Sequence, residues 1–224
     1  MLFRSILPRT GQTKTAEFTA LSARQKIPLL QDNGLILTES AAIVTYLSDT
    51  YGQPHNHLIP IDPRPRAQCL EWCFFVISEL DATSLYVMRR HGDLRHIYGE
   101  APLANAAASD YFQKQMRTVE RALADNPHYI LGDRFTAADI LLSTCVTWAV
   151  RYGVPVSDPV RTYNERVTAR PAYARALETN AAPTPAPPPA VPAPIPGTAP
   201  AHRQPDRLQS PCPGPAKAPG CTSS

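Results

Sequence analysis

Proline is distributed so unevenly that only part of this chain can build a packed fold. Of the 25 prolines in 224 residues, 14 lie in residues 181–224. Proline has no amide hydrogen and fixes the backbone φ angle, so a segment this rich in proline and alanine stays extended and solvated. We therefore expect a disordered Pro/Ala-rich tail over 181–224 and a packed fold within residues 1–180.

Charge and hydropathy exclude two classes of protein. The chain has a net charge of +3. The tail contributes three basic groups and one acidic group, so the body has 19 basic and 18 acidic groups. A body this balanced has no electrostatic surface for nucleic acid. The most apolar stretch, residues 72–77, is far shorter than the roughly 20 residues that span a bilayer. Residues 1–8 contain no secretory signal, so we expect a cytoplasmic protein with no membrane partner.

The five cysteines indicate reduced thiols. Cys69 and Cys73 are four residues apart and share one face of an expected helix, whereas Cys145 lies in an apolar run. Cys212 and Cys221 lie in the tail. An odd number at low density is typical of a reducing compartment. A metal site would need two further ligands nearby, and His91 and His96, five residues apart, do not have a ligand spacing. We expect no metal site.

A β-hairpin and a helix are predicted near the start of the chain. Asn33 and Gly34 separate two short apolar runs, and both residues tolerate the positive φ that a tight turn demands. Pro28 opens the first strand, where a missing amide hydrogen costs least. Apolar residues at helical spacing then predict a helix over 40–49, with Ser40 as its cap.

The rest of the body predicts helices. Residues 51–65 collect glycine and prolines and are typical of a linker. Residues 66–90 are apolar on most faces, which suits a helix buried between others. Residues 106–125 carry one clear apolar stripe, formed by Phe112, Met116, Val119 and Leu123. No strand pattern follows residue 38.

Thr136 and Asp139 form a capping-box pattern. In such a box, the Thr136 side chain accepts from the Asp139 amide and the Asp139 side chain accepts from the Thr136 amide. Phe135 and Ile140 occupy the flanking apolar positions. The helix expected over 137–152 is apolar nearly all round and must belong to the core. We interpret this motif as a folding signal and not as a functional one.

Three segments in this order resemble the soluble glutathione transferase family, over about residues 11–178. They are Lys26-Ile-Pro-Leu29 with the hairpin and Thr38-Glu-Ser-Ala-Ala-Ile43, then Gly132-Asp-Arg-Phe-Thr-Ala-Ala-Asp-Ile140, then Arg170-Pro-Ala-Tyr173. The resemblance implies the fold class α/β plus all-α. The expected domains are an incomplete thioredoxin-like domain over 1–52, an all-helical C-terminal domain over 66–178 and the tail.

The first segment has chemistry that suits one end of glutathione. A helix N-terminus binds a carboxylate, Ser40 adds a hydroxyl, and Glu39 suits an ammonium group. Ile27 before Pro28 presents its backbone amide and carbonyl to a peptide-like ligand. The resemblance implies a cis bond before Pro28 and assigns glutathione binding to Lys26, Ile27, Pro28, Glu39 and Ser40. The structural alternative is that Ser40 only caps a helix and Glu39 is solvated.

The start of the chain departs from the family pattern. The family begins with a strand, a helix and a second strand, and its catalytic Tyr, Ser or Cys ends the first strand. Here 17 residues precede Phe18, enough at about 3.3 Å per residue for one strand and a turn. Ser5 is the hydroxyl that suggests itself, but too few residues separate it from Pro28. We expect a truncated domain, an unidentified catalytic residue and weak or absent conjugation.

Three functional interpretations follow from these observations. The favoured one is a homodimeric glutathione transferase-like protein, in which the thiolate of glutathione attacks a small hydrophobic electrophile held against residues 66–90. The second is a non-catalytic glutathione-binding or scaffold protein that acts through its helical domain and tail. The third is that both chain ends are artefacts of the coding sequence, a late start and a shifted frame near residue 181.

Overall fold

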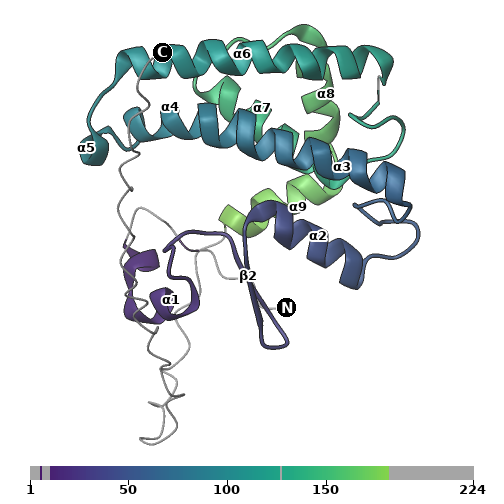
Figure 1. The fold of residues 1–224 in the computed structure, drawn as a ribbon, viewed down its shortest axis with the longest axis horizontal. Coiled ribbons are helices and arrows are strands. Elements are labelled where there is room, and N and C mark those ends of the chain that lie inside the picture. The colour runs from purple at the N-terminus through teal and green to yellow at the C-terminus, as the bar shows by residue number, and fades with distance from the viewer. Residues whose placement is uncertain (1–5, 7–10, 127, 182–224) are drawn as a thin grey trace, which may run out of the picture. The chain divides into compact units, whose positions relative to one another are not determined.

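The first half of the structure is built around a hairpin and the helix that follows it (Figure 1). The computed structural model describes residues 6, 11–126 and 128–181, all within the first of two units, residues 1–185. The prediction of a disordered tail therefore lies outside the described residues, except for Ala181. In order, the N-terminal elements are η2 (Gln12–Lys14), α1 (Ala16–Leu21), β1 (Leu29–Asp32), β2 (Leu35–Thr38) and α2 (Ser40–Tyr51).

The hairpin is confirmed. β1 and β2 pair antiparallel, with Leu29 opposite Thr38 and Asp32 opposite Leu35. Asn33 and Gly34 have φ values of 46° and 86°, the left-handed conformation that the turn requires. Within the described residues the sheet has these two strands.

Helices form the remainder of the described chain. They are α3 (Pro63–Phe75), η3 (Val76–Leu85), α4 (Tyr86–His91), α5 (Arg95–Tyr98), α6 (Pro102–Asp125), α7 (Ala137–Arg151), α8 (Asp158–Thr168) and α9 (Pro171–Ala181). α3, η3 and α4 follow one another as a single rod, and α6 runs alongside it in Figure 1. α7 packs against α3 and η3, and α8 packs against α7.

The helix expected over 66–90 differs from the observed one in two ways. It begins earlier, at Pro63, because proline is tolerated in the first turn, so the linker ends at Asp62. Its middle, η3, is a π-helix in which the Thr83 and Ser84 hydroxyls donate to carbonyls five residues back. Apolar spacing does not distinguish a π-helix from an α-helix, so the sequence pattern missed it.

The predicted core stripe of α6 is confirmed, because Phe112, Met116, Val119 and Leu123 are all buried. Cys69 and Cys73 share the buried face of α3 and are free thiols, as is Cys145 on α7. α7 is mostly buried, as expected, although Val150 near its end is exposed.

The capping box at the start of α7 is present and belongs to a larger buried network. The Thr136 amide and hydroxyl donate to Asp139 Oδ2 at 2.8 and 3.0 Å. The other carboxylate oxygen, Oδ1, accepts from the Ile130 amide at 3.0 Å and the Tyr163 hydroxyl at 2.8 Å. Asp139 is fully buried, so these four donors replace the water it loses.

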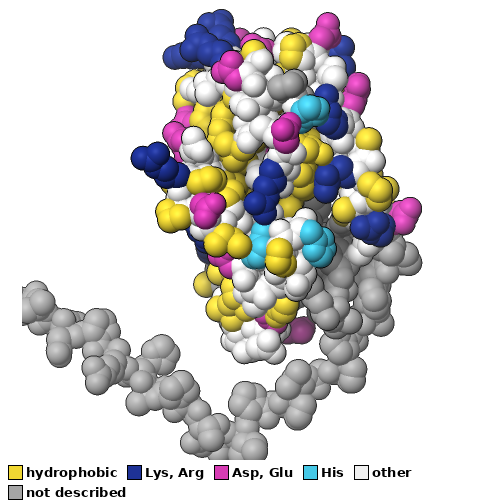
Figure 2. Space-filling model, turned by 90° about the vertical axis from the view of Figure 1, so that its right-hand side faces the viewer, with side chains coloured by type: hydrophobic (Ala, Val, Ile, Leu, Met, Phe, Trp, Pro, Cys, Tyr) yellow, Lys and Arg dark blue, Asp and Glu magenta, His cyan; other side chains and the backbone are white. Residues whose placement is uncertain are grey.

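Charged side chains of both signs are interspersed with apolar ones on the face that Figure 2 shows. This agrees with the balanced charge of the body. Within the described residues, no helix has the length and apolarity needed to cross a membrane.

We predict that Thr136→Ala lowers the free energy of unfolding by about 1 kcal/mol, because it removes a cap side chain from a buried helix start. Chemical denaturation measures the change. The control is Thr144→Ala, which removes an exposed hydroxyl on the same helix that donates to the Ile140 carbonyl, and we expect a change below about 0.5 kcal/mol. Equal losses for the two variants would contradict this account of the network.

Candidate functional site

The hairpin register brings the five predicted site residues together. Leu29 pairs with Thr38, so the residues that precede β1 lie beside those that follow β2. Lys26, Ile27 and Pro28 therefore enter the hairpin at the same end from which Glu39 and Ser40 leave it. The Ile27–Pro28 bond is cis, as the resemblance implied.

The N-terminus of α2 carries no side-chain cap. The N-cap residue is Glu39 and not Ser40, so that prediction was wrong, and Ser40 is the first residue of the helix. Glu39 has a φ of 74°, an unusual value for a long side chain and a type of strain that collects at functional sites. The Ile43 amide bonds the Glu39 carbonyl at 2.9 Å, so three helix amides precede that first intrahelical bond. Such amides attract an anion.

Two cations lie at this site. Arg24 forms an ion pair with Glu39, and both side chains are more than half exposed. Sequence reasoning missed this pair, since no spacing rule links residues 24 and 39. Exposed pairs contribute little free energy, so a ligand ammonium can displace Arg24. The Lys26 Nζ lies 5.0 Å from the ring centroid of Tyr86, at the start of α4.

Asp32 holds the hairpin to α2. Its Oδ2 accepts hydrogen bonds from the hydroxyls of Tyr46 at 2.8 Å and Tyr51 at 2.5 Å. These bonds lower the pKa of the Asp32 carboxyl, and the same interaction raises the pKa of Tyr51 to about 12. Asp32 thus helps to fix the strands that lead into and out of the site.

The hydroxyls of residues 11–28 are either buried or already bonded. The Thr15 hydroxyl caps α1 by accepting from the Phe18 amide, and the Thr19 hydroxyl accepts from Gln25. Thr13 and Ser22 are buried, as are the three described cysteines. Ser5 lies outside the described residues.

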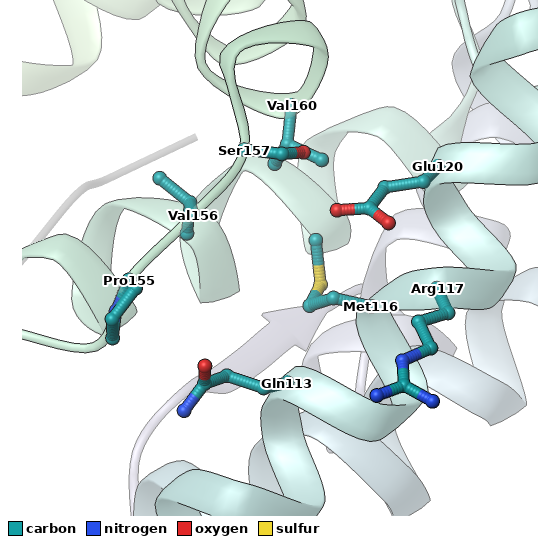
Figure 3. A pocket seen from close by; sticks show the side chains of 8 residues that line it. All are labelled: Gln113, Met116, Arg117, Glu120, Pro155, Val156, Ser157 and Val160. Carbon is teal, nitrogen blue, oxygen red and sulfur yellow. The ribbon is translucent and has the colours of Figure 1, made fainter.

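Two cavities formed by the described residues lie away from the five residues. One, of about 350 Å³, separates Gln113, Arg117 and Glu120 on α6 from residues 155–160 (Figure 3). The other, of about 510 Å³, lies between the linker with the first turns of α3 (residues 54–68) and the segment that leads into α7 (residues 131–136). No sequence signal pointed to either. Among the described residues, no cluster of three His, Cys, Asp or Glu side chains is placed to hold a metal ion.

Two family models match the chain. The glutathione S-transferase N-terminal domain matches residues 4–49, and the C-terminal domain of that family matches residues 102–178. The glutathione S-transferase GstA of Escherichia coli O157:H7 is 30% identical over 165 residues, 72% of this chain and 77% of that protein. The chain spans 55–65% of the length of other curated relatives.

Solved structures agree with this relationship. A delta-class glutathione transferase of Nilaparvata lugens is 26% identical with a TM-score of 0.66, covering 79% of this chain and 81% of that one. A glutathione transferase family member of Pseudomonas fluorescens, solved with two glutathione molecules bound, shares the fold at 24% identity and a TM-score of 0.65, over 76% of this chain and 78% of that one. The hairpin, α2 and the helical domain define a glutathione transferase fold. The chain belongs to the glutathione transferase family.

We predict that Asp32→Asn lowers the thermal midpoint at neutral pH. The folded-state pKa of Asp32 is lowered from its ordinary value of 3.8. Its contribution to the free energy of unfolding is therefore complete above pH 3.8 and is lost as the pH falls through the folded-state pKa. The pKa of Tyr51 is raised from its ordinary value of 10.0. Its contribution to the free energy of unfolding is therefore complete below pH 10.0 and is lost as the pH rises through about 12. The difference between wild type and variant should therefore shrink at both extremes.

Thermal unfolding followed by circular dichroism across this pH range checks the prediction. Asp110→Asn removes an exposed carboxylate on α6 and serves as the control. A wild-type advantage over Asp32→Asn that stays constant from pH 3 to pH 12 would contradict the role given to Asp32.

Proposed function

We propose that this chain binds glutathione at the start of α2 and transfers it to an electrophile. The observation that carries the proposal is the uncapped helix N-terminus at Ser40, held by the hairpin register beside the cis Ile27–Pro28 bond. An anion site next to a fixed, exposed stretch of backbone matches a peptide that carries carboxylates.

Each predicted residue has a distinct part in this proposal. The α2 amides and the Ser40 hydroxyl bind the α-carboxylate of the γ-glutamyl group, and Glu39 receives the ammonium after releasing Arg24. The backbone of Ile27, oriented by Pro28, bonds the peptide of the cysteinyl residue. Lys26 supplies positive charge for the second carboxylate of the tripeptide.

The reaction we propose is attack of the glutathione thiolate on a small electrophile. The sulfur forms a carbon–sulfur bond, the thiol proton passes to solvent, and any leaving group departs with its electron pair. A hydrogen-bond donor near the sulfur would favour the thiolate by stabilising its charge. By analogy with the family, we also propose a homodimer and a cytoplasmic location.

A non-catalytic glutathione-binding protein is the second candidate. The observation that favours it is that the hydroxyls of residues 11–28 are buried or bonded within the chain. A conjugation assay with a chlorinated nitrobenzene separates the two candidates. Binding with enzyme-like turnover supports the transferase, whereas binding without turnover supports the second candidate.

We predict that Ser40→Ala weakens glutathione binding about tenfold, since it removes a hydrogen bond to a charged group. Isothermal titration calorimetry with glutathione measures the affinity. Thr118→Ala, an exposed hydroxyl on α6, is the control and should bind like the wild type. If the wild type does not bind glutathione, or if Ser40→Ala binds it as tightly as the wild type, the site is wrongly assigned.

A further inference from the structure

The π-helix η3 carries an acidic side chain that the proposed function does not use. Asp81 is partly buried, and within the described residues no hydrogen bond or ion pair reaches its carboxylate. The Tyr86 amide donates to the Asp81 carbonyl, so both residues belong to the same wide turn. π-turns in helices are rare and are frequently found at functional sites.

The surroundings of Asp81 place it between the helical core and the glutathione residues. On one side, Lys26 lies over the Tyr86 ring, and the charges of Lys26 and Glu39 both act on the Asp81 carboxyl. On the core side, the negative charge of Asp81 contributes, after burial, to the raised pKa of the Cys145 thiol on α7. Asp81 and Tyr86 are five residues apart, one turn of the π-helix, so Asp81 lies on the face of η3 that Lys26 approaches.

Among the residues that the structure describes, none forms an ion pair or a hydrogen bond with the Asp81 carboxylate. Burial raises the pKa of its carboxyl, and the positive charge of Arg89 opposes that shift without forming an ion pair. The Arg89 guanidinium instead lies 5.6 Å from the ring centroid of Trp148. A partly buried carboxylate without a hydrogen-bonded partner is costly, so a cation from a ligand would find a favourable position there.

The tripeptide does not need Asp81, because its ammonium is assigned to Glu39 and its carboxylates to α2 and Lys26. We propose that Asp81 selects the second substrate, by accepting a hydrogen bond from a protonated amine on the group that becomes attached to the glutathione sulfur. This inference rests on the proposed function and adds a cationic class to the electrophiles expected from the sequence.

Two glutathione conjugates of nearly equal size test the proposal by calorimetry. S-(2-aminoethyl)glutathione carries an ammonium where S-propylglutathione carries a methyl group. We expect the wild type to bind the amino conjugate about tenfold more tightly, as a charge-assisted hydrogen bond would produce. In Asp81→Asn the two affinities should become equal, with the affinity for S-propylglutathione unchanged. Asp110→Asn should keep the tenfold preference.

The outcomes separate this inference from the proposed function. Equal affinities in the wild type, or an undiminished preference in Asp81→Asn, would overturn the role of Asp81 while leaving glutathione binding intact. If the wild type binds neither conjugate nor glutathione, the proposed function fails and this inference fails with it. The wild-type comparison needs no variant, so it decides the matter even if Asp81→Asn folds poorly.

Discussion

A single buried carboxylate holds the helical domain in register. Asp139 accepts four hydrogen bonds, from the Thr136 amide and hydroxyl, the Ile130 amide and the Tyr163 hydroxyl. These donors come from the start of α7, from the segment before it and from α8. A fully buried carboxylate tolerates the loss of water only when its lone pairs are satisfied in this way. This one side chain therefore ties the start of α7 to α8 and to the segment before it.

A short series of hydrogen bonds connects α7 to α2, the helix that carries the candidate site. The Ala137 amide donates to the Leu58 carbonyl at 2.8 Å. The amides of Leu58 and Ile59 both donate to the Ser48 hydroxyl, near the end of α2, at 3.0 Å. α2 also packs directly against α7. The helix whose N-terminus faces the proposed ligand is thus fixed at its other end to the helical domain.

Sequence reasoning succeeded where local chemistry determines the structure. Asn33-Gly34 specifies the turn of the hairpin, and Thr136 with Asp139 specifies the start of α7, because few other conformations suit these residues. The same hairpin register then brought residues 26–28 beside residues 39–40. The N- and C-terminal family matches confirmed the family that these motifs indicated.

The predictions failed where tertiary packing decides. Ser40 is a residue type favoured at helix N-caps, yet the N-cap position is occupied by Glu39, which has a positive φ. A single helix was expected where α3, η3 and α4 occur, since a π-turn leaves the apolar pattern unchanged. The charges that act on the Asp81 carboxyl belong to residues 26, 39 and 89, and no local sequence pattern connects these positions.

The central claim is that the first amides of α2 bind a carboxylate of glutathione. Nuclear magnetic resonance of the ¹⁵N-labelled protein observes these amides directly during a titration with glutathione. We expect the signals of the Ser40, Ala41 and Ala42 amides to shift saturably with one common dissociation constant. Shifts confined to the cavity between α6 and residues 155–160, with the α2 amides unmoved, would contradict it.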